Sequence, residues 1–187
     1  MPILAQAIGI VAMCFNISSY QFKNKRNVLL FQLISSVLFS VNMFMLGATM
    51  GGILNAIGVI RAFVFLYRDR IQPHLKAINL SFMLVYILSY VLLFTVLGKE
   101  PTAKNLIIEL LPLIGMGAMT IGFSGTNAKA IRIYGFISSP CWLTYNCFNF
   151  AIGAILCEAF AIVSNLLAFI RLDLKKKATD KTEEVQS

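Results

Sequence analysis

The chain carries the stretch RAFVFLYRD at residues 61–69 and repeats its pattern as NLLAFIRLD at residues 165–173. A constant offset of 104 residues relates the two stretches and also pairs Asn42 with Asn146. Further out, the apolar pattern of residues 8–69 is echoed over residues 114–173, with one extra apolar segment between the copies. Each copy contains three apolar runs long enough to cross a bilayer, so the pattern predicts a duplicated three-helix unit.

The composition is typical of a membrane protein. Of the 187 residues, 58% are hydrophobic and 13% are charged, whereas soluble domains are roughly half apolar and about a quarter charged. The short alternating segments of a membrane β-barrel are missing, so the sequence predicts an all-α integral membrane protein. The net charge of +8 does not indicate nucleic acid, because basic residues beside apolar spans usually reflect membrane orientation.

Seven membrane helices are predicted, and a linker helix separates two groups of three. The predicted spans are residues 2–22, 28–46, 52–67, 77–97, 106–123, 132–150 and 154–170. The corresponding domains are a first three-helix repeat at 1–76, a linker helix and outer loop at 77–105, a second three-helix repeat at 106–173, and a disordered cytoplasmic tail at 174–187. All four cysteines are expected to be small buried residues, and the alternative is a disulfide between Cys147 and Cys157 near the outer face.

Basic residues mark alternate loops, which predicts the orientation of the chain. Clusters of Lys and Arg lie on one side of the membrane, at residues 23–26, 68–76, 129–132 and 171–181. The loops on the other side contain only Lys99 and Lys104. The positive-inside rule places the N-terminus outside and the C-terminus inside. The single linker helix adds one membrane crossing, so both three-helix units enter the membrane in the same orientation. The sequence therefore predicts parallel 3+1+3 repeats, as in SWEET sugar transporters.

The chain resembles the YgjV family of bacterial inner-membrane proteins, which is grouped with the SWEET, SemiSWEET and PQ-loop superfamily. The resemblance runs to about residue 177 and rests on topology and on a diffuse set of residues: Ser18, Ser19, Tyr20, Gln21, Lys23, Gln32, Asn42, Leu46, Gly47, Ala48, Asn55 and Arg61. It implies a multi-pass protein of the bacterial inner membrane. The superfamily implies transport of sugars, amino acids or vitamins, and it also includes cargo receptors.

The chain departs from the PQ-loop pattern at the Pro-Gln pairs. Tyr20-Gln21 and Thr126-Asn127 stand at the matching positions, so the hinge that proline supplies is missing from both. The resemblance implies that Asn55 contacts substrate, with Glu158 or Ala159 as its counterpart in the second repeat. It gives Phe39 and Trp142 the role of aromatic residues beside the solute.

Polar residues inside predicted spans need a partner or a cavity, which makes them candidate site residues. Asn42 and Asn146 either line a solute pathway or form hydrogen bonds between helices. Arg61 either extends toward the cytoplasmic interface or binds an acidic group.

Glu158 is the acid deepest inside a span and is a candidate for proton coupling, and Asn165 shares its helix face. Glu109 is expected at the membrane interface.

The sequence therefore predicts a transporter, a facilitator for a small polar or sugar-like solute that works by alternating access. The alternatives are a facilitator for vitamin or nucleoside uptake and a membrane receptor or scaffold that binds a ligand without moving it. No nucleotide-binding or nucleophile motif is present, so no enzyme activity and no cofactor or metal are expected. The expected partners are the solute and membrane lipid, and the sequence leaves open a homo-oligomer.

Overall fold

The computed structural model describes residues 2–19, 25–125 and 128–169, and within them the protein is entirely helical. Seven long helices run along one direction: α1 (Pro2–Ser19), α2 (Lys25–Met45), α3 (Thr49–Leu66), α5 (Leu75–Thr95), α6 (Ala103–Ser124), α7 (Ala128–Phe148) and α8 (Ile152–Ala168). A short helix α4 (Arg68–Ile71) and a 3-10 turn η1 (Gln72–His74) replace the loop expected between α3 and α5. The predicted tail at 174–187 lies outside the described residues.

The helices end where the sequence supplies turn residues. Gly47 and Gly98 adopt positive φ angles of 74° and 69° just after α2 and α5, a conformation that costs glycine little. The Thr102 side chain caps the start of α6 by accepting a hydrogen bond from the Asn105 backbone N–H at 3.2 Å. These turns make short connections, so consecutive helices are antiparallel neighbours.

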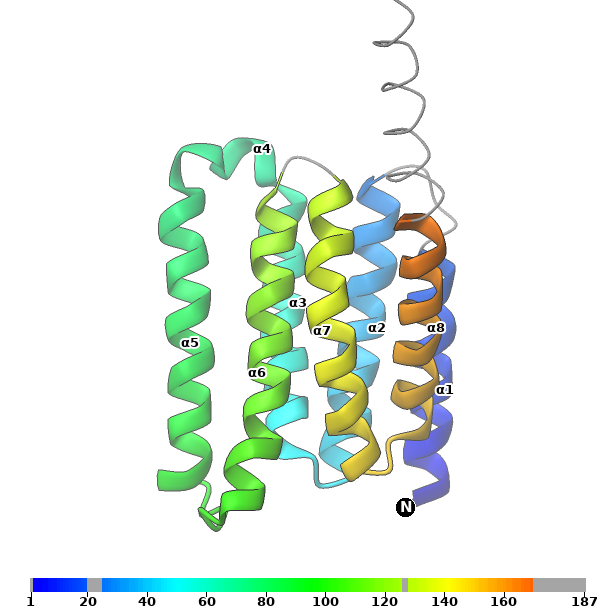
Figure 1. Ribbon diagram of the computed structural model, residues 1–187, viewed down its shortest axis with the longest axis vertical. Helices are drawn as coiled ribbons and strands as arrows, with labels where there is room; N and C mark the ends of the chain where they lie inside the picture. Colours follow the sequence, from blue (N-terminus) through cyan, green and yellow to red (C-terminus); the bar gives the residue numbers. More distant parts are fainter. Residues whose placement is uncertain (1, 20–24, 126–127, 170–187) are drawn as a thin grey trace, which may run out of the picture.

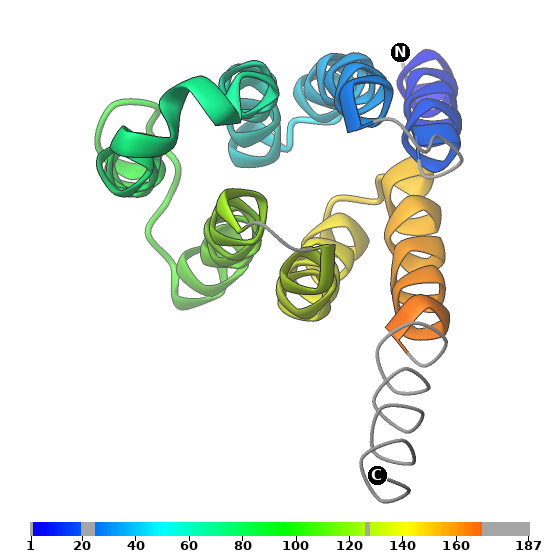
Figure 2. The same ribbon diagram turned by 90° about the horizontal axis from the view of Figure 1, so that it is seen from above.

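The long helices form two facing rows (Figure 2). One row contains α3, α2 and α1, and the other contains α6, α7 and α8. Across the gap α1 packs against α8 and α3 packs against α6, while α5 stands at the end of the rows beside α3 and α6. The middle helices α2 and α7 therefore face each other across the centre of the molecule.

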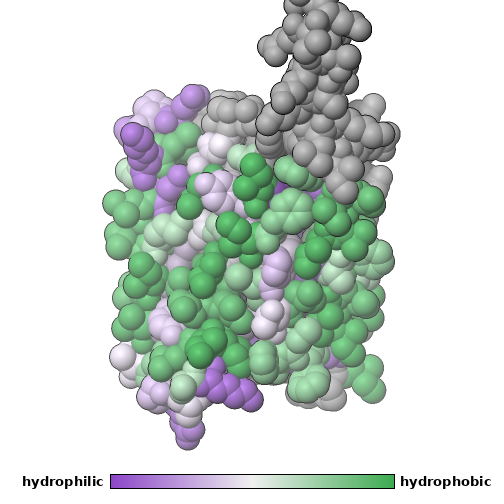
Figure 3. Space-filling model, in the orientation of Figure 1, coloured by the Kyte–Doolittle hydropathy of each residue, from purple (hydrophilic) through white to green (hydrophobic). Residues whose placement is uncertain are grey.

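The outer surface suits a lipid environment. Large hydrophobic side chains are exposed on all seven long helices, and they form an apolar belt with polar residues at its ends (Figure 3). By length and composition α3, α6 and the segment Gln72–Thr95 are able to cross a membrane, and shorter apolar helices occur at Ile3–Ser19, Leu30–Met45 and Ile152–Leu167. Helices satisfy their own backbone hydrogen bonds, which a hydrocarbon environment requires.

Candidate functional site

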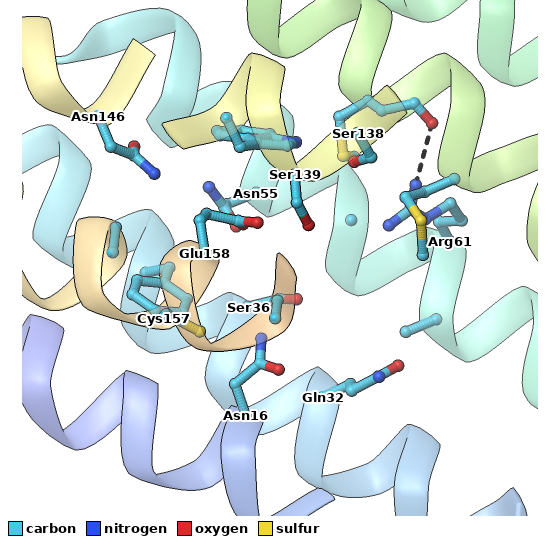
Figure 4. A pocket seen from close by; sticks show the side chains of 18 of the residues that line it. Asn16, Gln32, Ser36, Asn55, Arg61, Ser138, Ser139, Asn146, Cys157 and Glu158 are labelled. Atoms are coloured by element: carbon cyan, nitrogen blue, oxygen red, sulfur yellow. Dashed lines mark hydrogen bonds between the residues drawn. The ribbon is translucent and has the colours of Figure 1, made fainter. Parts of the chain in front are cut away.

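A cavity of about 150 Å³ lies between the two rows. At ~10–15 Å³ for one water, it has room for on the order of ten water molecules, which suits a small solute. Its polar lining comes from α1, α2, α3, α7 and α8 (Figure 4), through Asn16, Gln32, Ser36, Asn55, Arg61, Ser138, Ser139, Asn146 and Glu158. A cavity of this size with several polar groups in a partly apolar lining is the arrangement expected of a solute site in a membrane protein.

Asn55 and Glu158 face the same part of the cavity. Each is the seventh residue of its helix, Asn55 in α3 and Glu158 in α8, and both helices start at the lower end of Figure 1. The Asn55 amide nitrogen donates to the Gly51 carbonyl at 2.9 Å, so its oxygen is left for the cavity. Ser139 lies beside the Glu158 carboxyl group (Figure 4). Hydrogen-bond acceptors therefore gather at this level.

Arg61 lines the cavity six residues further along α3 than Asn55. Its Nη1 donates to the Met116 carbonyl and to the Thr120 hydroxyl, both at 3.2 Å, so the side chain points across to α6 and not to a membrane interface. The guanidinium carbon lies 5.1 Å from the centre of the Phe123 ring, a cation–π distance. Nε is buried and has no hydrogen-bond partner.

Aromatic side chains form part of the remaining lining, together with methionines and small residues. Phe39 and Trp142 both line the cavity, from the two middle helices. Trp142 fits against α6 because residue 115 is glycine: a Cβ there would lie 2.8 Å from the indole ring. The Trp142 ring meets the Tyr145 ring edge to face, with centroids 6.0 Å apart. This packing fixes the indole face beside the polar groups.

The lower end of the cavity is closed by a buried polar network. Tyr145 is fully buried, and its hydroxyl accepts a hydrogen bond from the Gly51 N–H at 2.9 Å. The same hydroxyl faces the carboxylate of Glu109, which forms an ion pair with Lys99. Glu109 was expected at the interface, but its side chain is only 2% exposed. The network joins α3, α6, α7 and the loop before α6.

The lining is partly exposed at more than one level of the cavity. Asn16, Gln32 and Phe123 toward the upper end are partly buried, and so are Asn55 and Glu158 lower down. Met43, Phe65 and Asn146 are each only 1% exposed.

The structure brings together six of the eight predicted site residues. The cavity is lined by Phe39, Asn55, Arg61, Trp142, Asn146 and Glu158. Asn42 instead donates to the Ala5 carbonyl at 2.6 Å, which joins α2 to α1. Asn165 donates to the Arg132 carbonyl at 2.7 Å, which joins α8 to α7. These two asparagines bond helices together and do not line the cavity.

Several lining residues were not among the predicted site residues. Asn16 and Ser139 are polar residues inside apolar helices. Because a polar side chain is energetically costly in a membrane, their position in the sequence could have identified them as cavity residues. Met116, Met119 and Phe123 have no such signal, because apolar residues at helical spacing look the same whether they face a cavity, a helix or lipid. Within the described residues no group of three His, Cys, Asp or Glu side chains gathers, and all four cysteines are free.

Comparison with known proteins identifies the family. The sequence model of Imp-YgjV, described as a bacterial inner membrane protein, matches residues 3–176, which is nearly the whole chain. Neither a curated protein nor a solved structure gives a significant match. The helical structure with its apolar belt agrees with that description. The chain therefore belongs to the Imp-YgjV family and is a protein of the bacterial inner membrane.

Proposed function

We propose that the protein is a carrier for a small polar solute, which binds in the cavity between the two rows and crosses the membrane by alternating access. The observation that carries the proposal is the cavity itself. It places amides, hydroxyls, one guanidinium and one carboxyl group between facing helices of an inner-membrane protein. Such groups are costly in a membrane and usually mark a solute or ion pathway.

The helix arrangement supports a parallel 3+1+3 design. A half-turn about the centre of Figure 2 carries α1 onto α6, α2 onto α7 and α3 onto α8. The two contacts across the gap, α1 with α8 and α3 with α6, exchange under this operation. Carriers with such repeats bind solute at the repeat interface and rock one bundle against the other. Pro112 and Pro140 interrupt backbone bonding in α6 and α7, which gives the second bundle two points that bend easily.

The distribution of basic residues assigns the two ends. Arg70 and Lys76 lie at the upper end, which makes that end cytoplasmic under the positive-inside rule. The lower end, where Tyr145 and Glu109 are buried, then faces outward, with the N-terminus. A carrier of this kind would alternate between an inward-open and an outward-open state.

Passive transport is the simplest mechanism for this chain, because its sequence contains no nucleotide-binding motif. Among the described residues Glu158 is the one acidic group of the cavity lining, and it is the residue through which proton coupling would act. If Glu158→Gln leaves the pH dependence of uptake unchanged, proton coupling through Glu158 is ruled out. We propose no catalytic activity.

Uptake into liposomes tests the proposal. Purified protein is reconstituted, and entry of labelled sugars, polyols, amino acids, vitamins and nucleosides is followed. Ala62 lines the cavity, whereas Ala56 on the same helix is exposed on the outside. We expect saturable uptake of at least one solute, loss of that uptake in Ala62→Trp, and retention in the matched control Ala56→Trp. Binding of a solute that is never transported would instead identify a receptor.

A further inference from the structure

We propose that the solute is a small zwitterion, with a carboxylate bound by Arg61 and an ammonium group bound near Glu158. The inference rests on the proposed function, since it takes the cavity to be the solute site. It goes further by naming the chemical class, and it replaces the sugar-like solute with an amine-and-acid one. A guanidinium and a carboxyl group share this cavity, and among the described residues no ion pair joins them.

Arg61 has the features of a carboxylate site. Its Nη1 is held by the Met116 carbonyl and the Thr120 hydroxyl, which fixes the plane of the guanidinium. Nε is buried without a partner, and among the described residues no carboxylate lies within ion-pair distance of Arg61. Guanidinium groups bind carboxylates through parallel N–H···O bonds, and Nε is able to supply one of them. A buried donor without an acceptor is costly, so a bound carboxylate would remove that cost.

The region around Glu158 has the features of an ammonium site. An ammonium group has three donors and no acceptor, so it needs several acceptors close together. Glu158 offers a carboxyl group, and Asn55 offers the amide oxygen that Gly51 leaves unused. Asn146 also lines the cavity, and its buried Oδ1 has no partner. Figure 4 shows Asn55 beside Glu158, with Asn146 on the same side.

The two groups stand at different levels of one cavity, which a bridging molecule can span. The backbone of Arg61 lies six residues beyond the level of Asn55 and Glu158, which is ~9 Å along a helix axis. A hydrogen bond of ~2.9 Å at each end takes up part of that span. Amino acids with the amine one to three carbons from the carboxylate are short enough to fit between the two groups.

Other solute classes satisfy at most one of the two sites. A neutral polyol would offer no counter-charge to Arg61 and no ammonium group to the acceptors around Glu158, and a simple anion or amine would satisfy only one of the two sites. Charges away from water are costly unless they are paired. A zwitterion brings no net charge into the cavity and pairs both groups at once.

Thermal stabilisation of the purified full-length protein tests the inference, because a ligand bound only to the folded state raises its unfolding temperature. The probes are glycine, β-alanine and γ-aminobutyrate, with propionate, propylamine and erythritol as matched single-charge and neutral controls. We expect stabilisation by at least one amino acid and none by the three controls. Equal stabilisation by erythritol, propionate or propylamine would overturn the inference, as would no stabilisation by any amino acid.

Variants at both ends separate charge recognition from folding. Arg61→Gln and Glu158→Gln should each weaken amino acid binding about tenfold or more, the usual effect of losing a charge-assisted hydrogen bond. Arg61→Lys keeps the positive charge but lacks the paired N–H donors of the guanidinium, so it should weaken amino acid binding less than Arg61→Gln does. Ser89→Ala on the outside of α5 is the control and should bind normally. If folded Arg61→Gln and Glu158→Gln both bind as the wild type does, the inference is wrong.

The inference and the proposed function can fail separately. Amino acid binding without uptake into liposomes would support the zwitterion site and contradict the carrier. Uptake of a neutral solute, with no amino acid bound, would support the carrier and contradict the zwitterion site.

Discussion

Asn42 and Asn146 occupy matching positions 104 residues apart, yet their surroundings differ. The Asn42 amide nitrogen donates a 2.6 Å hydrogen bond to the Ala5 carbonyl, its Oδ1 is buried without a partner, and the side chain packs against Gly9 of α1. Asn146 lines the cavity with an unpaired oxygen. One residue type at equivalent sites thus serves helix packing in one copy and faces the solute site in the other.

This difference predicts opposite effects of the same substitution. Asn42→Ala removes a bond between helices, so it should lower the free energy of unfolding by ~0.6 kcal/mol and at most ~1.7 kcal/mol, with little change in solute affinity. Asn146→Ala should weaken solute binding with little loss of stability. Denaturant titration and binding measurements on both variants check this. If only Asn42→Ala lowers the affinity for solute, then Asn42 and not Asn146 belongs to the solute site.

Glu109 supports a second prediction at the residue scale. Its carboxylate is buried, whereas Glu100 in the adjoining loop is exposed. Removing one partner of a buried ion pair is costly, but the Lys99 side chain is 28% exposed and water compensates in part. We expect Glu109→Gln to destabilise the protein by about 1–3 kcal/mol. Glu100→Gln should change the stability by less than ~0.5 kcal/mol, and equal effects of the two variants would argue against the network.

At the scale of helices, α1 and α8 approach closely at Gly9 and Gly153, where an added Cβ has the shortest contact among the described glycines. A Cβ on Gly153 would lie within the backbone of Gly9, so only glycine allows this crossing. Gly58 differs, because a Cβ there would have the Met116 methyl as its nearest neighbour, at an ordinary 3.5 Å. Small residues that let helices approach are a common basis of helix association in membranes.

The contrast gives a matched pair of substitutions. Gly153→Ala should force α1 and α8 apart and cost about 1–3 kcal/mol of stability, a typical price of overpacking. Gly58→Ala should be neutral or stabilise by up to ~1 kcal/mol, because alanine favours helix. Thermal unfolding in detergent measures both. A destabilised Gly58→Ala with an unaffected Gly153→Ala would contradict the helix packing described.

At the scale of the whole molecule, the sequence predicted the helices well. All seven expected spans are close to observed helices, since long apolar runs have few alternatives in a membrane. The short α4 and η1 were missed because Arg68–His74 is polar and lacks apolar periodicity. The repeat arrangement and the orientation remain predictions that the two-row packing and the basic loops support.

The candidate site was predictable in part. Polar residues inside apolar spans pointed to Asn55, Arg61 and Glu158, because a membrane makes each of them costly. The sequence had no means of telling Asn165 from Asn146, since both are asparagines on polar faces and only tertiary contacts separate them. The Lys99–Glu109 pair was missed because its burial depends on how the loop before α6 folds back.

The central claim is that the cavity opens to both sides of the membrane in turn, and two-sided labelling of Asn55→Cys tests it most directly. Cys14, Cys141, Cys147 and Cys157 are first replaced by alanine, and a membrane-impermeant thiol reagent is applied to inside-out and right-side-out vesicles. The account predicts labelling from the cytoplasmic side, and labelling from the outer side in the fraction of molecules that open outward. Labelling from one side only, with and without solute, would contradict it.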